Sequence, residues 1–260
     1  MKNYNIKEIE ITSCVDYIQK IGALDLKLDL EGKGSLVLYR GQEEDWGLLP
    51  KIGRDTYLSS DILKKEEKII TEFQRLAYPH LDINLKDNDW DLLALAQHHR
   101  LPTRLLDWTE YPLAALWFAF AKENRNYSNR YVWSFIVKEN ELGNANNGFP
   151  YNQPRTIVFK PNHITKRITA QNGWFTVHKF VEKKKKFVPL NENRIYYKRL
   201  TKFIIPESLR DDILISLDRL GINSFSLFPD LDGLSDYLDW KNFKRKSFRD
   251  FLLFSSRRST

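Results

Sequence analysis

Residues 89–121 hold two strongly apolar stretches with a dense run of polar and ionisable side chains between them. The segment reads DWDLLALAQHHRLPTRLLDWTEYPLAALWFAFA, and its pattern predicts a helix, a short strand at Leu105–Leu106 and a second helix. The polar residues between the helices are Gln97, His98, His99, Arg100, Thr103, Arg104, Asp107 and Thr109. Because such groups are costly to bury without partners, the segment indicates either a ligand site between two packed helices or a polar network that fixes the fold.

The composition is that of a folded protein. Hydrophobic residues make up 42% and aromatic residues 13% of the 260 residues, which excludes a disordered chain. Cys14 is the only cysteine, so an intramolecular disulfide framework and a CxxC motif are excluded. The N-terminus lacks the apolar segment of a signal peptide, and no apolar run is long enough to span a membrane. We expect a cytoplasmic protein without a membrane partner.

The net charge of +7 is concentrated in two places. These are Lys183–Lys186 and the tail 241–260, which contains Lys241, Lys244, Arg245, Lys246, Arg249, Arg257 and Arg258. Basic patches of this kind bind nucleic acid or other polyanions, whereas the alternative is a solvated turn and a solvated terminus. Few aromatic residues alternate with these charges, which favours the second interpretation.

The periodicity changes along the chain. Helical spacing predicts helices in the first half, after Ser13 and over 61–77, 90–97 and 112–121. The second half predicts strands at 131–137, 156–160, 168–171, 174–178 and 202–205, a helix over 207–220, a loop at 224–232 and a last helical stretch at 233–240. With a strand at 35–39, this order predicts one α+β domain with a helix-rich N-terminal half and a mainly antiparallel sheet contributed largely by the C-terminal half. We divide the chain into an N-terminal extension (1–29), the domain (30–240) and a basic tail (241–260).

Four motifs occur in order along the chain. They are LYRGQ (38–42) with WGLLP (46–50), the stretch 97–109, the stretch 167–175 and LFPDLDG (227–233). Together they resemble the FRG domain family, which takes its name from a Phe/Tyr-Arg-Gly motif, and the resemblance spans about residues 30–240. Arg100 departs from the family, which usually has Gly there. The resemblance does not by itself assign an activity.

The order of elements also resembles the ADP-ribosyltransferase fold. In that superfamily a first strand carries an Arg or His that holds NAD, a second carries a Ser, Thr or Tyr beside the nicotinamide, and a later strand carries a Glu or Gln. Arg40, Thr109 and Gln171 take these places in this sequence. The analogy, which is one of fold, implies an ADP-ribosyltransferase-like architecture, NAD as the cofactor and no metal.

The chemistry of Arg40 agrees with that role. A guanidinium grips phosphate with a planar fork, and Gly41 would let a ligand approach the backbone closely. The alternative is an Arg paired with a structural carboxylate. Neither GxGxxG nor GxxxxGK[ST] is present, so a Rossmann or P-loop site is not expected.

Each remaining candidate has a functional and a structural interpretation. We expect the ligand-binding set to comprise Arg40, Gly41, Gln97, His98, Thr103, Arg104, Asp107, Trp108 and Phe175. Structurally, Asp107 would pair with Arg104, Thr109 would cap the helix that follows, and Trp108 would be core.

Gln171 carries no charge, so it cannot act as a catalytic carboxylate. In a transferase the acid would then move to Asp107, Asp230 or Asp232. Asp230 and Asp232 would bind Mg²⁺ or cap a helix, and capping is favoured.

The leading hypothesis is a nucleotide-binding cleft of NAD type, in an ADP-ribosyltransferase or NAD glycohydrolase that acts as a toxin or in phage defence. A non-catalytic module that binds a nucleotide, or nucleic acid through the basic tail, is the alternative. A metal-dependent phosphodiesterase built on Asp107, Asp230 and Asp232 is a third. The sequence names no protein target, acceptor or oligomeric state.

Overall fold

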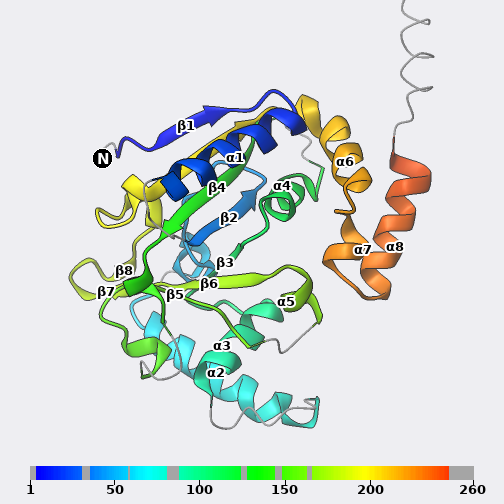
Figure 1. The fold of residues 1–260 in the computed structure, drawn as a ribbon. Helices are drawn as coiled ribbons and strands as arrows, with labels where there is room; N and C mark the ends of the chain where they lie inside the picture. Colours follow the sequence, from blue (N-terminus) through cyan, green and yellow to red (C-terminus); the bar gives the residue numbers. More distant parts are fainter. Residues whose placement is uncertain are drawn as a thin grey trace, which may run out of the picture.

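The protein is built around one mixed seven-stranded sheet. The computed structural model describes residues 4–30, 36–57, 59–80, 88–123, 128–143, 148–162 and 166–245. The strand order of the sheet is β1-β9-β4-β2-β3-β6-β5 (Figure 1). The strands are β1 (Lys7–Glu10), β2 (Leu36–Gln42), β3 (Leu105–Thr109), β4 (Arg130–Val137), β5 (Ile157–Phe159), β6 (Gly173–Val177) and β9 (Leu200–Ile205). Among the strands of the described residues, only β1 and β9 pair in parallel, so the mixed helix-and-sheet class and the mainly antiparallel sheet are confirmed.

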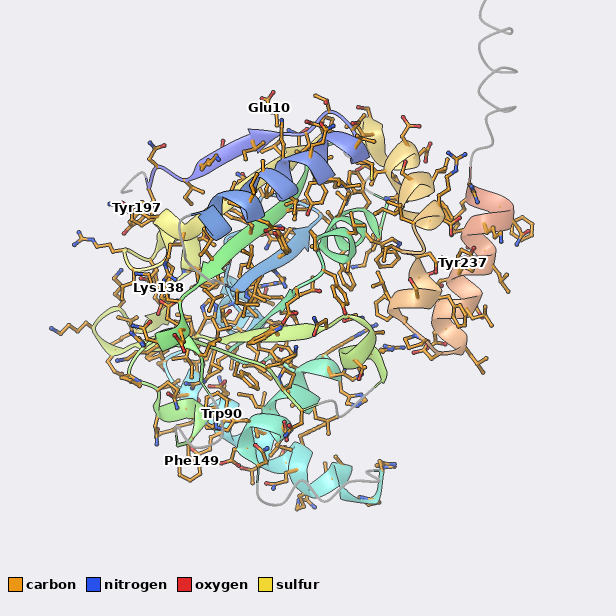
Figure 2. All side chains as sticks on the ribbon, in the orientation of Figure 1. Glu10, Trp90, Lys138, Phe149, Tyr197 and Tyr237 are labelled. Atoms are coloured by element: carbon orange, nitrogen blue, oxygen red, sulfur yellow. The ribbon has the colours of Figure 1, made fainter. Side chains whose placement is uncertain are left out.

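Two groups of helices pack on this sheet (Figure 1). The helices α1 (Cys14–Leu30), α4 (Pro112–Phe120) and α6 (Arg210–Arg219) form a core with β2, β4 and β9. The helices α2 (Ile62–Ala77) and α3 (Asp89–His98) form another with β3, β5 and β6. Side chains fill the space between helices and sheet (Figure 2). The chain continues through α7 (Ser224–Leu227) and α8 (Leu231–Asp239), and a small hairpin joins β7 (Phe180–Val181) to β8 (Lys186–Phe187).

Two expectations about the elements were wrong. The predicted strand 168–171 is helix α5 (Lys166–Ala170) and a turn, because a run this short does not separate helix from strand by periodicity. The predicted loop 224–232 begins with α7, where the Asn223 side chain accepts from the Ser226 N–H at 3.0 Å and the Asn223 N–H donates back to the Ser226 hydroxyl at 3.0 Å. β4, β5, β6 and β9 lie after residue 129 whereas β1, β2 and β3 precede residue 110, so four of the seven strands come from the C-terminal half.

A buried ion pair joins α2 to the start of β3. Arg104, which the sequence placed in the ligand-binding set or beside Asp107, instead donates from Nε to both carboxylate oxygens of Glu66 at 3.0 Å. Both side chains are almost fully buried, and the Arg104 guanidinium stacks on Tyr151 at 4.9 Å. Removing either partner would leave a buried charge without its counter-ion, so Arg104 is a structural residue.

Gly41 lies where α4 crosses β2. A Cβ atom at this position would stand 2.0 Å from the Ala115 carbonyl oxygen and 2.5 Å from the Ala119 nitrogen. The glycine therefore serves the close packing of a helix on a strand, and the approach of a ligand to its backbone stays a prediction. Among the described residues, no helix combines the length and the apolar character needed to cross a membrane.

We predict that Gly41→Ala lowers the free energy of unfolding by about 3 kcal/mol or more, because the methyl group meets backbone atoms that cannot move independently. Urea denaturation measures the change. Gly22→Ala is the matched control, since a Cβ at Gly22 in α1 meets no atom within 4 Å. That control should gain roughly 0.5–1 kcal/mol from helix propensity. Equal stability of the two variants would contradict the packing argument.

Candidate functional site

A cleft of about 360 Å³ opens where β2 and β3 separate. The two strands share only the register pair Tyr39↔Thr109, whereas β2 pairs with β4 over its whole length from Leu36 to Gln42. The lining residues are Tyr39, Arg40, Gly41, Gln42, Glu43, Trp46, Gln97, His98, Arg100, Asp107, Trp108, Thr109, Phe118, Arg167, Gln171 and Phe228. Side chains from all four sequence motifs therefore line the cleft.

Most of the predicted site residues meet in this cleft. Its lining includes the predicted residues Arg40, Gly41, Gln97, His98, Asp107, Trp108, Thr109 and Gln171. Thr103, Arg104 and Phe175 are not among the lining residues. Phe175 is 4% exposed and stacks on Phe159 with ring centroids 5.5 Å apart, so it belongs to the core between sheet and α3.

Arg40 bridges the split between the two strands. Its Nη1 donates to the Asp107 backbone carbonyl at 2.8 Å and lies 3.7 Å from the Asp107 carboxylate. The Nε atom is buried and has no hydrogen-bond partner among the described residues. Desolvation by burial lowers the pKa of Arg40, Asp107 opposes this change and Arg54 adds to it. A buried guanidinium with an unused donor is suited to an anionic ligand.

Asp107 is held from a second side by Gln97. The Gln97 Nε2 donates to Asp107 Oδ2 at 2.9 Å, and the Gln97 Oε1 accepts from the Thr103 hydroxyl at 2.6 Å. Thr103 is fully buried, so its hydroxyl fixes which way the amide points. Thr103 therefore does not line the cleft but orients Gln97, which does.

Thr109 and Gln171 contact each other directly. The Thr109 hydroxyl donates to the Gln171 backbone carbonyl at 2.6 Å and accepts from the Tyr111 N–H at 3.0 Å. The expected cap of α4 by Thr109 is wrong, because Tyr111 occupies the N-cap position and makes no side-chain cap. Gln171 lies in the turn before β6, and its Nε2 donates to the Leu227 carbonyl at 3.0 Å.

Trp108 forms part of the cleft wall but is packed in the core. The side chain is 3% exposed, its Nε1 donates to the Thr176 hydroxyl at 3.1 Å, and its ring lies 5.6 Å from that of Phe135. This supports the core interpretation over the stacking of a base. Tyr39, Trp46, Phe118 and Phe228 also line the cleft, and the rings of Phe118 and Phe228 lie with centroids 6.0 Å apart in an edge-to-face contact.

His98 is the last residue of α3 and lies half-buried at the cleft. Desolvation is the largest cause that lowers the pKa of His98 below 6.5, and His99 and Arg167 lower it further. Asp107 and Asp230 act in the opposite direction. The imidazole is therefore neutral at pH 7 and can accept a proton.

Arg167 and Arg100 also line the cleft, although the sequence did not assign these two cations to the site. Arg167 pairs with Asp230 at 2.6 Å, and its guanidinium lies 5.2 Å from the ring centroid of Phe228. Both Arg167 and Phe228 fall within the sequence motifs, which was the signal that could have found them.

Arg100 is the other cation. Its φ of 68° lies in the left-handed region, a conformation that glycine adopts freely and that costs about 1–3 kcal/mol for other residues. This explains why the resembling family usually has Gly there. The arginine adds a positive charge to the lining at the cost of backbone strain.

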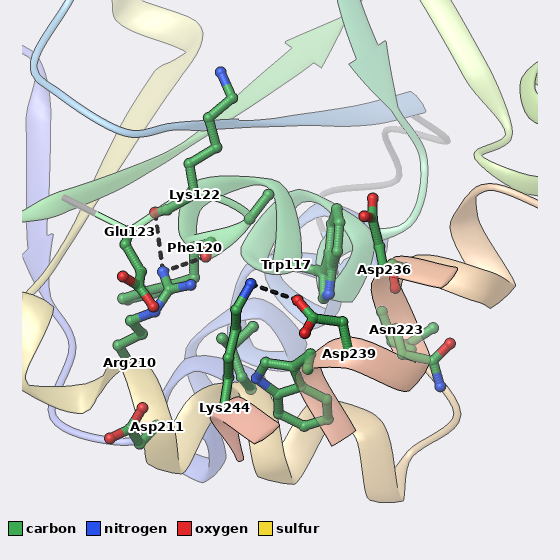
Figure 3. Close-up of a pocket in the computed structure, with 15 residues that line it drawn as sticks. Trp117, Phe120, Lys122, Glu123, Arg210, Asp211, Asn223, Asp236, Asp239 and Lys244 are labelled. Carbon is green, nitrogen blue, oxygen red and sulfur yellow. Dashed lines mark hydrogen bonds and ion pairs between the residues drawn. The ribbon is translucent and has the colours of Figure 1, made fainter. Parts of the chain in front are cut away.

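A second cavity, of about 430 Å³, lies beside α4, α6 and α8 (Figure 3). Two of its basic side chains are engaged with the protein itself. Lys244 pairs with Asp239 at 2.6 Å, and Arg210 donates to the backbone carbonyls of Phe120 and Lys122 (Figure 3). None of the predicted site residues lines this cavity. The second cavity is larger than the cleft at the β2–β3 split, but the cleft contains the predicted site residues and is therefore the candidate functional site.

The contacts of Asp230 separate the capping interpretation from the Mg²⁺ interpretation. Asp230 accepts from the Gly233 N–H at 2.9 Å and so caps α8, as favoured from the sequence. Within the described ranges, no group of three or more His, Cys, Asp or Glu could hold a metal ion.

In the basic segments, Lys183–Lys186 are exposed and Arg245 pairs with Asp218, while residues 246–260 lie outside the described residues.

Residues 35–128 match the sequence model of the FRG domain. This match supports the resemblance to the FRG domain over residues 35–128, which contain the first two of the four motifs. The matched range runs from β2 through α4 and includes Arg40, Gln97, His98 and Asp107. No curated protein and no solved structure matches the chain.

We predict that His98 titrates below pH 6.5 in an NMR titration of its ring protons. Arg167→Gln should raise this midpoint, because it removes a positive charge that disfavours the imidazolium. Asp107→Asn should lower it, because it removes a negative charge that favours the imidazolium. A midpoint at or above 6.5, or shifts of the opposite sign, would refute the electrostatics of the cleft.

Proposed function

We propose that the cleft at the β2–β3 split binds a phosphorylated nucleotide, with NAD as the leading candidate, and that it breaks the N-glycosidic bond of that ligand. The observation that carries the proposal is the buried Arg40 guanidinium with an unused Nε donor inside a cleft of about 360 Å³. Ligand pockets of roughly 300–1,000 Å³ are typical of small-molecule sites. The volume suits one nucleoside half, with the remainder of a dinucleotide reaching toward solvent.

The charges of the lining favour phosphate. Arg40, Arg100 and Arg167 contribute three guanidinium groups, while Glu43 and Asp107 contribute two carboxylates. Guanidinium groups bind phosphate oxygens through pairs of charge-assisted hydrogen bonds. In this proposal Arg40 grips the pyrophosphate, and no glycine-rich phosphate loop is needed.

The remaining groups suit a ribose and a flat ring. Phe118 and Phe228 offer aromatic surface for a nicotinamide or adenine ring. Gln171 hydrogen-bonds a ribose hydroxyl. Thr109 positions Gln171 through the hydrogen bond to its carbonyl and in this way orients the ribose side. An effector role, in a toxin or in phage defence, would follow from depletion of NAD or modification of a target.

The alternative is a module that binds a nucleotide without reacting with it. Gln171 favours this alternative, because a carboxamide cannot stabilise a cationic transition state as a carboxylate does. Binding and bond cleavage must therefore be measured separately.

We predict that Arg40→Gln weakens the binding of NAD by about 10–100-fold, which corresponds to the loss of a charge-assisted interaction. Isothermal titration calorimetry measures the dissociation constant, and chromatography of the same samples measures released nicotinamide. Arg219→Gln is the matched control, since Arg219 is exposed on α6 and does not line the cleft. Thermal melting shows whether each variant is folded. Unchanged affinity in a folded Arg40→Gln variant would contradict the proposal.

A further inference from the structure

The proposed reaction needs a negative charge beside the ribose, and the position of Gln171 does not supply one. As the N-glycosidic bond breaks, positive charge develops on the ribose ring, and carboxylates are the groups that stabilise such a charge in glycoside hydrolysis. The acid must therefore come from elsewhere in the cleft.

The acids considered from the sequence can be separated by their contacts. Asp230 caps α8 and pairs with Arg167, so its oxygens are engaged. Asp232 has a 92% exposed side chain and does not line the cleft. The carboxylates among the lining residues are Glu43 and Asp107.

Glu43 and Asp107 differ in how firmly they are held. The Glu43 carboxylate is 3.4 Å from Lys122, whose side chain is 78% exposed, and exposed pairs of this kind restrain a side chain weakly. Asp107 instead lies on β3 and receives a hydrogen bond from Gln97 at Oδ2. Its backbone is tied to β2 by Arg40. Its Oδ1 has no hydrogen-bond partner among the described residues, and the side chain is 55% exposed.

We propose that Asp107 is the carboxylate that stabilises the positive charge on the ribose, and that Gln97 is the residue that positions it. This inference rests on the proposed function. Thr103 completes the arrangement, because its buried hydroxyl holds the Gln97 carbonyl and so directs the Gln97 amide toward Asp107. Supports of this kind, built on a strand and a helix, hold a catalytic group in place.

The step balances without an oxidant, a metal or a third reactant. The bond between C1′ of the ribose and the nicotinamide nitrogen breaks, and the electron pair leaves with the nitrogen. A water oxygen then forms the new bond to C1′, and its proton passes to the neutral imidazole of His98 and on to solvent. The products are ADP-ribose, nicotinamide and one proton.

The test is the rate of nicotinamide release from NAD by the full chain, with the dissociation constant of NAD measured in the same samples. Asp107→Asn keeps the shape of the side chain and removes its charge. We expect kcat to fall about 100–1,000-fold, as for the loss of other electrostatic transition-state contacts, while the affinity for NAD changes by less than about threefold. Asp212→Asn removes an equal charge from the exposed first turn of α6 and should leave kcat unchanged.

A double-mutant cycle tests the role of Gln97. Gln97→Ala should lower kcat without raising KM, and should have no further effect in the Asp107→Asn background, because both changes remove one interaction. A merely structural glutamine would give additive losses in the two backgrounds.

The outcomes separate this inference from the function on which it rests. A wild-type protein that does not bind NAD overturns both. Wild-type binding without cleavage leaves nucleotide binding standing and overturns the role of Asp107. Full activity in Asp107→Asn, an equal loss of affinity and rate in that variant, or a larger loss in Glu43→Gln overturns the role of Asp107 while leaving the NAD-cleaving function in place.

Discussion

The contact between Arg40 and Asp107 spans the one place where the main sheet comes apart. On either side of it the strands pair over most of their length, β2 with β4 and β3 with β6, yet β2 and β3 share a single register pair. The Arg40 guanidinium crosses this split and binds the Asp107 carbonyl at 2.8 Å. The bridge places a positive and a negative group on the walls of the cleft.

Contacts from distant segments complete the cleft around this bridge. The Thr109 hydroxyl holds the Gln171 backbone, and the Gln171 amide holds the carbonyl that ends α7. Arg167 is joined to the residue that caps α8. The C-terminal helices are thus attached to the ends of β3 and α5, and their position determines where Phe228 meets the cleft.

The sequence predicted α3, α4 and the start of β3, because these segments are strongly apolar and are separated by a polar run, by Pro102 and by Pro112. It also grouped Arg40, Gln97, His98 and Asp107 correctly by motif. It could not assign their partners. Arg104 and Asp107 lie three residues apart, yet each pairs with a residue that is distant in sequence, Glu66 and Arg40. Such choices depend on strand register, which spacing along the chain does not determine.

The most direct test of the central claim is a crystal structure of the protein with bound ADP-ribose. The account predicts density in the cleft at the β2–β3 split, with pyrophosphate oxygens within hydrogen-bonding distance of the Arg40 guanidinium. Density in the second cavity beside α8, with the cleft empty, would contradict it. An unoccupied cleft at millimolar ligand would contradict it as well.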